Sequence, residues 1–134
     1  MEITEIKPGM KFEAFEQVTE TKTATVMGSG ALPVYATPAM MCLMEKAASD
    51  LAELYLPEGW TSVGIKMEAA HEAPTPVGVK VRAEAVVKAV EGRKIVYEVR
   101  AYDAQGEIGK GVHERFAVQA EKFLANAETR KAEN

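Results

Sequence analysis

One acidic residue stands inside the most apolar segment of this sequence. Glu45 lies between Met44 and Ala47, in a stretch whose apolar residues recur at helical spacing. A carboxylate in such surroundings must be paired, hydrogen-bonded or protonated. Apolar surroundings are typical of carboxylates that attack a carbonyl group or activate water. The alternative is an ordinary surface carboxylate, because the nearby Lys46 and Asp50 indicate that one face of the helix meets solvent.

Thr37 and Pro38 mark the start of the same helix. Pro38 suits the first helical turn, where its missing N–H is not needed, and Thr37 is readily explained as the N-cap. A helix start also offers unpaired N–H groups that stabilise developing negative charge, which gives Thr37 a second, catalytic interpretation. Thr37 and Glu45 lie about 12 Å apart along a regular helix. They can act on one carbonyl only if Thr37 folds back before the helix, or if the two meet across a subunit boundary.

The sequence has two histidines, either of which could move a proton near neutral pH. His71 lies at the end of a predicted strand, just before a proline-rich turn, and such positions often carry catalytic groups. His113 lies within the last predicted strand, and we interpret it as structural. The histidines and the scattered carboxylates lack the spacing of metal ligands, so we predict no metal site. The Gly-x-Ser-x-Gly motif of serine hydrolases and a phosphate-binding loop are also absent from the sequence.

These residues need a scaffold, and the apolar periodicity predicts one long helix and several strands. Helical spacing runs from Thr37 to about Leu56 and ends at Pro57-Glu58-Gly59. The helix is apolar around most of its girth, so we expect it to be buried. Period-two alternation or β-forming residues predict strands over residues 10–26, 60–72, 78–90, 94–103 and 107–120. A long helix followed by an antiparallel meander predicts an α+β hotdog arrangement, in which a curved sheet of about five strands wraps the helix.

Length and charge limit the classes of protein that the chain can represent. Its 134 residues suit a single domain, which we place at residues 1–125, followed by a polar tail at residues 126–134. From Glu121 on we expect one helical turn and then disorder. The net charge of −4 argues against nucleic acid as a partner. Residues 79–100 hold 6 Lys and Arg against 3 Asp and Glu, so this hairpin is either a solvated face or a contact for ligand phosphates.

The single cysteine, Cys42, excludes a disulfide within the chain. The acidic start is not a signal peptide, and no apolar run approaches the ~18 residues that a membrane helix requires. We therefore expect a cytoplasmic protein without membrane contact.

Four segments together resemble the fluoroacetyl-CoA thioesterase family of hotdog proteins. They are the helix start Ala36-Thr37-Pro38 through Ala47, the turn from His71 to Gly78, the hairpin Val90-Glu91-Gly92-Arg93 and the strand from Glu107 to Arg115. The segments occur in the family's order and spacing, over about residues 8–125.

The resemblance implies hydrolysis of an acyl-CoA thioester to free acid and CoA. It places the family's catalytic roles on Thr37, Glu45 and His71, and its substrate contacts on Gly64 and Arg115. We expect no cofactor beyond the CoA of the substrate, and a homodimer or a tetramer as the assembly. Glu45 would act as nucleophile or general base, and His71 would move the proton.

One departure from the family pattern concerns the acyl group. The fluoroacetyl enzyme carries phenylalanines just before its threonine, whereas this chain has Gly28-Ser29-Gly30-Ala31-Leu32. The resemblance therefore implies the thioesterase chemistry with a different acyl group. The alternative is a binding protein for acyl-CoA or another small ligand on the same fold, since a fold does not determine a function. Nothing in the sequence suggests the acid–base layout of a hotdog hydratase.

Overall fold

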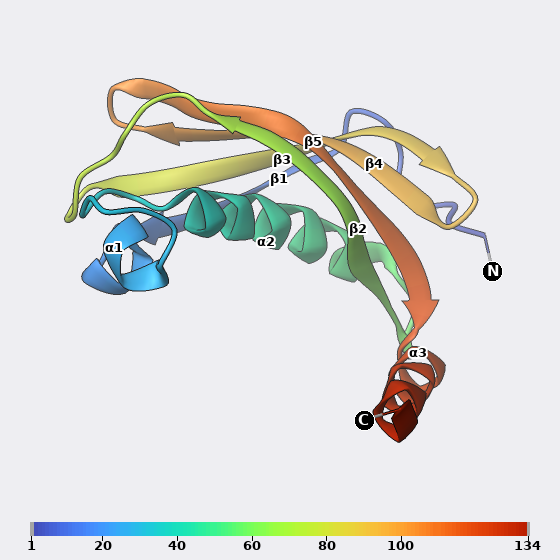
Figure 1. Ribbon diagram of the computed structural model, residues 1–134. Helices are drawn as coiled ribbons and strands as arrows, with labels where there is room; N and C mark the ends of the chain where they lie inside the picture. The colour runs from blue at the N-terminus through green and yellow to red at the C-terminus, as the bar shows by residue number, and fades with distance from the viewer. Residues whose placement is uncertain (1, 134) are drawn as a thin grey trace.

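A long helix lies against the concave face of a five-stranded antiparallel sheet in this computed structural model (Figure 1). The structure describes the backbone of residues 2–133 and the side chains of residues 2–131. The strands are β1 (Lys11–Gln17), β2 (Trp60–His71), β3 (Lys80–Glu91), β4 (Lys94–Asp103) and β5 (Gly106–Gln119). Their order across the sheet is β1-β3-β4-β5-β2, which makes β1 and β2 the two edge strands. The predicted α+β hotdog arrangement is confirmed.

Helix α2 (Thr37–Tyr55) supplies one half of the core. Its buried residues recur at intervals of three and four and include Met40, Met44 and Leu51, all at most 1% exposed. Burying a side chain of this size contributes about 1.5–3 kcal/mol, so this face anchors the helix to the sheet. The strands supply the other half through alternating inward residues, such as Val81, Ala83, Ala85 and Val87 of β3.

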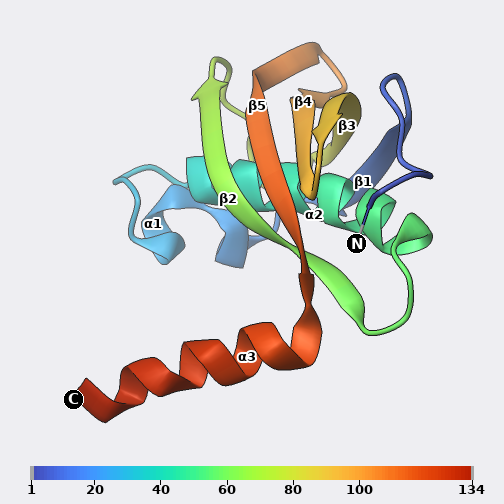
Figure 2. The ribbon, with the colours of Figure 1, turned by 90° about the vertical axis from the view of Figure 1, so that its right-hand side faces the viewer.

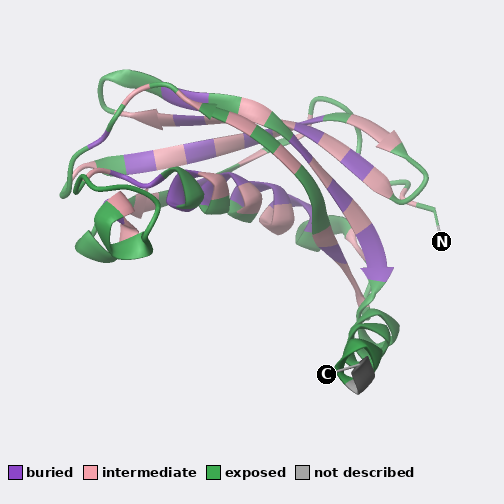
Figure 3. Ribbon diagram, in the orientation of Figure 1, coloured by how far each residue is buried: buried purple, intermediate pink, exposed green. Residues whose placement is uncertain are grey.

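The opposite face of α2 is open in the single chain, which corrects the expectation of a fully buried helix. The open face includes Cys42, Leu54 and Tyr55, and Figure 3 shows exposed and half-buried positions along the side of α2 that turns away from the sheet. The sheet of one chain therefore covers only part of the apolar surface of α2.

The segment 10–26 is only partly a strand, so that prediction is wrong beyond Gln17. A 3₁₀ helix (Glu20–Lys22) and the short helix α1 (Ala24–Met27) follow β1. The Thr23 side chain accepts a hydrogen bond from the Val26 N–H, and Gly28 ends α1 in the left-handed conformation at φ 78°. Local capping thus prevails over the β propensity of the Thr and Val residues.

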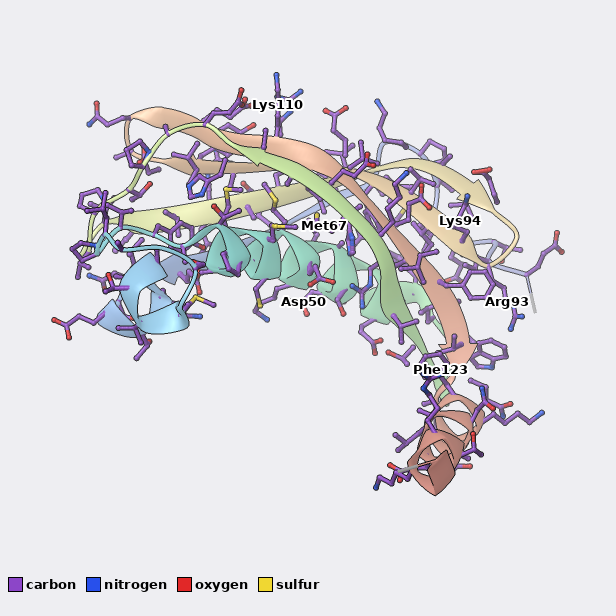
Figure 4. The ribbon with its side chains drawn as sticks, viewed as in Figure 1. Asp50, Met67, Arg93, Lys94, Lys110 and Phe123 are labelled. Atoms are coloured by element: carbon purple, nitrogen blue, oxygen red, sulfur yellow. The ribbon has the colours of Figure 1, made fainter. Side chains whose placement is uncertain are left out.

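The C-terminal tail is more helical than the sequence suggested. Helix α3 (Ala120–Glu128) runs across the predicted boundary at residue 125, and a 3₁₀ helix (Thr129–Glu133) continues it. Figure 2 shows α3 extending away from the sheet beyond the ends of β2 and β5. None of its described residues is buried, and its Phe123, labelled in Figure 4, is 45% exposed. No helix within residues 2–133 combines the length and apolarity needed to cross a bilayer.

Candidate active site

Two predicted site residues meet at the start of α2. The Oγ1 atom of Thr37 lies 2.8 Å from Nδ1 of His71, which is the last residue of β2. A pocket of about 270 Å³ opens beside them and is lined also by Ser29, Val34 and Tyr35. The sheet and the helix therefore bring a hydroxyl and an imidazole together at the mouth of a small pocket.

The first turn of α2 has no side-chain cap. Ala36 is the N-cap residue, and Thr37 is the first residue inside the helix, with Pro38 after it. The interpretation of Thr37 as the N-cap is therefore wrong, and so is the alternative in which it folds back before the helix. Because the Thr37 hydroxyl pairs with His71 instead, the helix start keeps N–H groups and the positive end of its dipole for a ligand.

The second ring nitrogen of His71 lacks a hydrogen bond. Its Nε2 atom is buried and has no hydrogen-bond partner among the described residues. Burial lowers the pKa of His71 below the ordinary value, and the Ala73 backbone only partly opposes this. The lowered pKa favours the neutral ring, whose Nε2 is left without a partner among the described residues.

Glu45 lies on α2 at the border between its buried and open faces. Its side chain is 44% exposed, which corrects the interpretation of a carboxylate enclosed by the apolar core. Yet one of its oxygens, Oε2, lies 3.6 Å from Nη1 of Arg115 and 3.8 Å from Nε2 of His113. The carboxylate thus faces a buried cation on one side and open space on the other.

Gly64 provides the room for this carboxylate. A Cβ atom at position 64 would lie 2.6 Å from Oε2 of Glu45, 3.2 Å from Cε1 of His113 and 3.4 Å from Nη1 of Arg115. The first distance is shorter than a normal nonbonded contact, so any side chain here would displace the carboxylate. The β2–β5 register also shifts just after Gly64, which is paired with Arg115.

Arg115 is buried, with 7% of the residue exposed. Its Nε donates to the Ser62 hydroxyl at 2.7 Å and its Nη2 to the Ser62 carbonyl at 2.9 Å. Burial lowers the pKa of Arg115, while the nearby Glu45 carboxylate favours its charged form. The guanidinium is directed inward, towards Glu45, and not towards the convex outer face of the sheet.

The three predicted catalytic residues do not converge within one chain. Thr37 and His71 form one cluster at the start of α2, and Glu45, Gly64 and Arg115 form the other. Thr37 and Glu45 belong to the same regular helix, which separates them by about 12 Å along its axis. A single carbonyl cannot reach both clusters of one subunit.

The sequence interpretation did not consider Ser62, and it treated His113 as structural without placing it in the second cluster. Ser62 and His113 both contact Arg115, and His113 is fully buried at 0% exposure. The available signal was the alternation of β5, which puts His113 and Arg115 on the same inward face. Two polar residues on an otherwise apolar inward face indicate a functional or paired cluster.

The basic hairpin is mostly engaged in pairs within the chain. Arg82 lies 2.7 Å from Glu13 and stacks on Tyr102, while Lys94 lies 3.9 Å from both Glu91 and Glu114. The guanidinium of Arg93 lies over the rings of Trp60 and Phe116. Figure 4 shows Arg93 and Lys94 at the β3–β4 hairpin.

Within residues 2–131, no three His, Cys, Asp or Glu side chains gather closely enough to hold a metal ion.

Comparison with known proteins finds the same architecture and one family. The sequence profile described as fluoroacetyl-CoA-specific thioesterase matches residues 18–121. A fluoroacetyl-CoA thioesterase from Streptantibioticus cattleyicolor is 41% identical over 92 residues, which span 69% of this chain and 66% of that protein. A solved mutant of a fluoroacetyl-CoA-specific thioesterase, in complex with fluoroacetate and CoA, has a TM-score of 0.83 and 35% identity, covering 88% of this chain and 99% of its own. A thioesterase superfamily member from Thermus thermophilus has a TM-score of 0.89 and 31% identity, covering 96% of this chain and 95% of its own.

Proposed function

Because the chain belongs to the fluoroacetyl-CoA-specific thioesterase family, we propose that it hydrolyses an acyl-CoA thioester at a site shared by two subunits. Membership of this family confirms the predicted hotdog fold and the predicted class, an acyl-CoA thioesterase. In our proposal one subunit supplies Thr37 and His71, and the other supplies Glu45. The observation that carries this arrangement is the 2.8 Å Thr37–His71 contact beside a pocket, with Glu45 of the same helix out of reach.

The free edge of β2 is the surface on which we build the dimer. This strand has 12 residues, of which only Lys66 and Glu68 are charged, and its Ile65 is 52% exposed. The other edge, β1, has 7 residues with three charges, features that discourage strand pairing. An isologous β2–β2 contact would join the two sheets into one.

The register of that contact follows from the two clusters. Antiparallel pairing centred on Glu68 would put Gly64 opposite His71 of the partner subunit, because the irregularity after Gly64 leaves both residues three ladder positions from Glu68 in the β2–β5 register. Glu45, which lies against Gly64, would then face the partner's Thr37–His71 pair. The same contact would cover part of the open face of α2.

The proposed chemistry uses only side chains, helix dipoles and water. The thioester carbonyl would lie at the uncapped start of α2, where backbone N–H groups and the Thr37 hydroxyl stabilise the oxyanion. Glu45 of the partner subunit would attack the carbonyl carbon or take a proton from the attacking water. In the second case His71 would carry that proton to the departing CoA sulfur. In the first case the attack would displace CoA as a thiolate and leave an acyl–Glu45 anhydride, which water would hydrolyse to the free acid while His71 passes a proton of that water to the thiolate. Gly64 and Arg115 lie beside the Glu45 carboxylate, which supports their role as substrate contacts.

The acyl group is proposed to be small and not selected by fluorine. The pocket beside His71 is lined by Ser29 and Val34 and has a volume of about 270 Å³ in one chain. The preceding loop has no aromatic residue to close over the acyl chain, and its Leu32 is 67% exposed. Because the substrate is a CoA ester and the only cysteine is a free thiol, we also propose a cytoplasmic location.

A panel of acyl-CoA esters tests this function. We expect catalytic release of CoA thiol from short acyl-CoA esters, measured with a thiol reagent, and turnover of acetyl-CoA within about 10-fold of fluoroacetyl-CoA, since one small substituent in a pocket changes discrimination little. Saturable binding of every ester by calorimetry without any thiol release would support the binding-protein alternative instead. A strong preference for the fluorinated ester would contradict the proposed acyl selectivity.

Replacing Gly64 with alanine should lower kcat by about 10- to 100-fold, because a displaced carboxylate loses its attack geometry. The new methyl group would lie 2.6 Å from Oε2 of Glu45. The melting temperature should change little, since the half-exposed carboxylate can move aside. The matched control is Gly64→Ala in a Glu45→Gln background, where no further loss is expected. An equal loss in both backgrounds would mean that Gly64 serves the fold and not the carboxylate.

A further inference from the structure

The hydrogen bonds of His113 define its tautomer. Its Nδ1 lies 2.7 Å from the carbonyl oxygen of Lys66, which only accepts, so Nδ1 carries the proton. Its Nε2 lies 3.1 Å from Nη1 of Arg115, which only donates, so Nε2 presents a lone pair. Burial, helped by the Arg115 charge, lowers the pKa of His113 and so favours this neutral form.

The His113 ring also packs against a tyrosine that is itself bonded to α2. It stacks on Tyr97 with centroids 6.0 Å apart, and the Tyr97 hydroxyl donates to the Ala48 carbonyl of α2 at 3.0 Å. Tyr97 and His113 are both fully buried. The position of Nε2 is therefore set by β4, β5 and α2 together.

The Arg115 guanidinium is fixed by hydrogen bonds to His113 and Ser62. Ser62 binds its Nε and Nη2, and His113 binds its Nη1, so all three guanidinium nitrogens have a partner within 3.1 Å. Nη1 is also the atom nearest to Glu45, at 3.6 Å, an ion-pair distance too long for a direct hydrogen bond. Nε2 of His113 thus binds the one guanidinium nitrogen that faces the carboxylate.

We propose that His113 is a positioning residue, which fixes the Arg115 guanidinium and, through its charge, the orientation of the Glu45 carboxylate. The inference rests on the proposed function, in which Glu45 attacks a thioester or activates water. Glu45 needs such an anchor because its side chain is 44% exposed and would otherwise sample several rotamers in water. A buried cation held by three hydrogen bonds favours the single orientation that points an oxygen towards Gly64 and the β2 edge.

Two substitutions of His113 separate positioning from packing. His113→Gln can place an amide oxygen near the Nε2 position and accept from Arg115, but it loses the bond to Lys66. His113→Asn can donate to Lys66, but it leaves Nη1 of Arg115 without an acceptor. We expect kcat to fall about 10-fold or more in His113→Asn, with KM changed less than about 3-fold, and to stay within about 3-fold in His113→Gln. The measurements are steady-state thiol release and the melting temperature of each variant.

The proposal is decided by which of the two His113 variants has the higher kcat. A merely structural histidine predicts activities that follow the melting temperatures, or equal losses in both variants, and either result would overturn the proposal. Should both variants fail to fold, Ser62→Ala replaces them: it removes only the hydroxyl that binds Nε, and a several-fold loss of kcat at unchanged KM is expected, whereas wild-type kcat would overturn the proposal. Glu45→Gln in the same assay tells the two hypotheses apart. If it keeps full activity, the proposed function fails; if it is inactive while His113→Asn has wild-type kcat, only the positioning role fails.

Discussion

Replacing Glu45 with glutamine should lower kcat for acyl-CoA hydrolysis by at least about 100-fold, the ordinary effect of losing a nucleophile or a general base. The amide preserves the size of the side chain and its place at the border of α2, but it has neither the charge nor the basic oxygen that the reaction needs. KM should change much less, because the carboxylate acts on the carbonyl and not on the CoA moiety. Thiol release at saturating and at low substrate separates the two constants.

Asp50→Asn is the matched control for this substitution. Asp50 belongs to the same helix, as Figure 4 shows, and its carboxylate pairs with Lys46 at 3.0 Å on the exposed face. Such an i,i+4 pair stabilises a helix by about 0.3–0.5 kcal/mol, so its loss should leave kcat unchanged. Near wild-type turnover in a folded Glu45→Gln protein would exclude both catalytic roles and favour the ligand-binding alternative.

The fold was predictable because its main elements have strong periodic patterns. The predicted helix end at Leu56 lies one residue beyond the observed end at Tyr55, and the strand 94–103 has the observed bounds. The strand prediction for residues 18–26 was wrong because the β-forming residues there do not alternate with polar ones. Thr23 caps the start of a short helix instead, and Gly28 ends it. The prediction for the tail after Gln119 was wrong because it followed the polar composition, although Ala120, Phe123, Leu124 and Ala127 recur at helical spacing; α3 is helical without contributing to the core.

The candidate site was only partly predictable. The pairing of Thr37 with His71 depends on where β2 ends relative to the start of α2, and neither local pattern contains that distance. Glu45 was singled out because of its apolar neighbours, yet what defines its surroundings is Arg115 on a strand 70 positions later in the chain. Ser62 and His113 act through that arginine, so only the three-dimensional structure shows why two such common residues are buried.

The open face of α2 and the separated clusters have one common explanation. A helix that is apolar around most of its girth, but covered by its own sheet on one side, is suited to a second covering surface. In our proposal the start of α2 with its Thr37–His71 pair supplies one half of a hydrolytic site, and the Glu45 carboxylate supplies the other half. One two-fold contact along β2 would cover apolar surface and complete two sites at once.

Heterodimers of two inactive variants should therefore recover activity. Thr37→Val removes the hydroxyl, Glu45→Gln removes the carboxylate, and each homodimer should lose at least about 100-fold in kcat. In a heterodimer of the two, one site is assembled from the intact Thr37 of one subunit and the intact Glu45 of the other, while the second site has neither. Co-expression with two different affinity tags and sequential purification gives this species free of homodimers. We expect about half of the wild-type kcat per dimer.

The matched control is a heterodimer of the wild-type chain with the Thr37→Val/Glu45→Gln double variant. If the sites are shared, each site of this species lacks one group and the dimer should be inactive, although it contains as many intact residues as the first heterodimer. If each site is built within one chain, the two results are exchanged: the control retains half of the activity and the first heterodimer has none. The residue content is the same in both species, so folding, expression and dimer stability affect them alike, and only the way in which the second subunit completes the site distinguishes them.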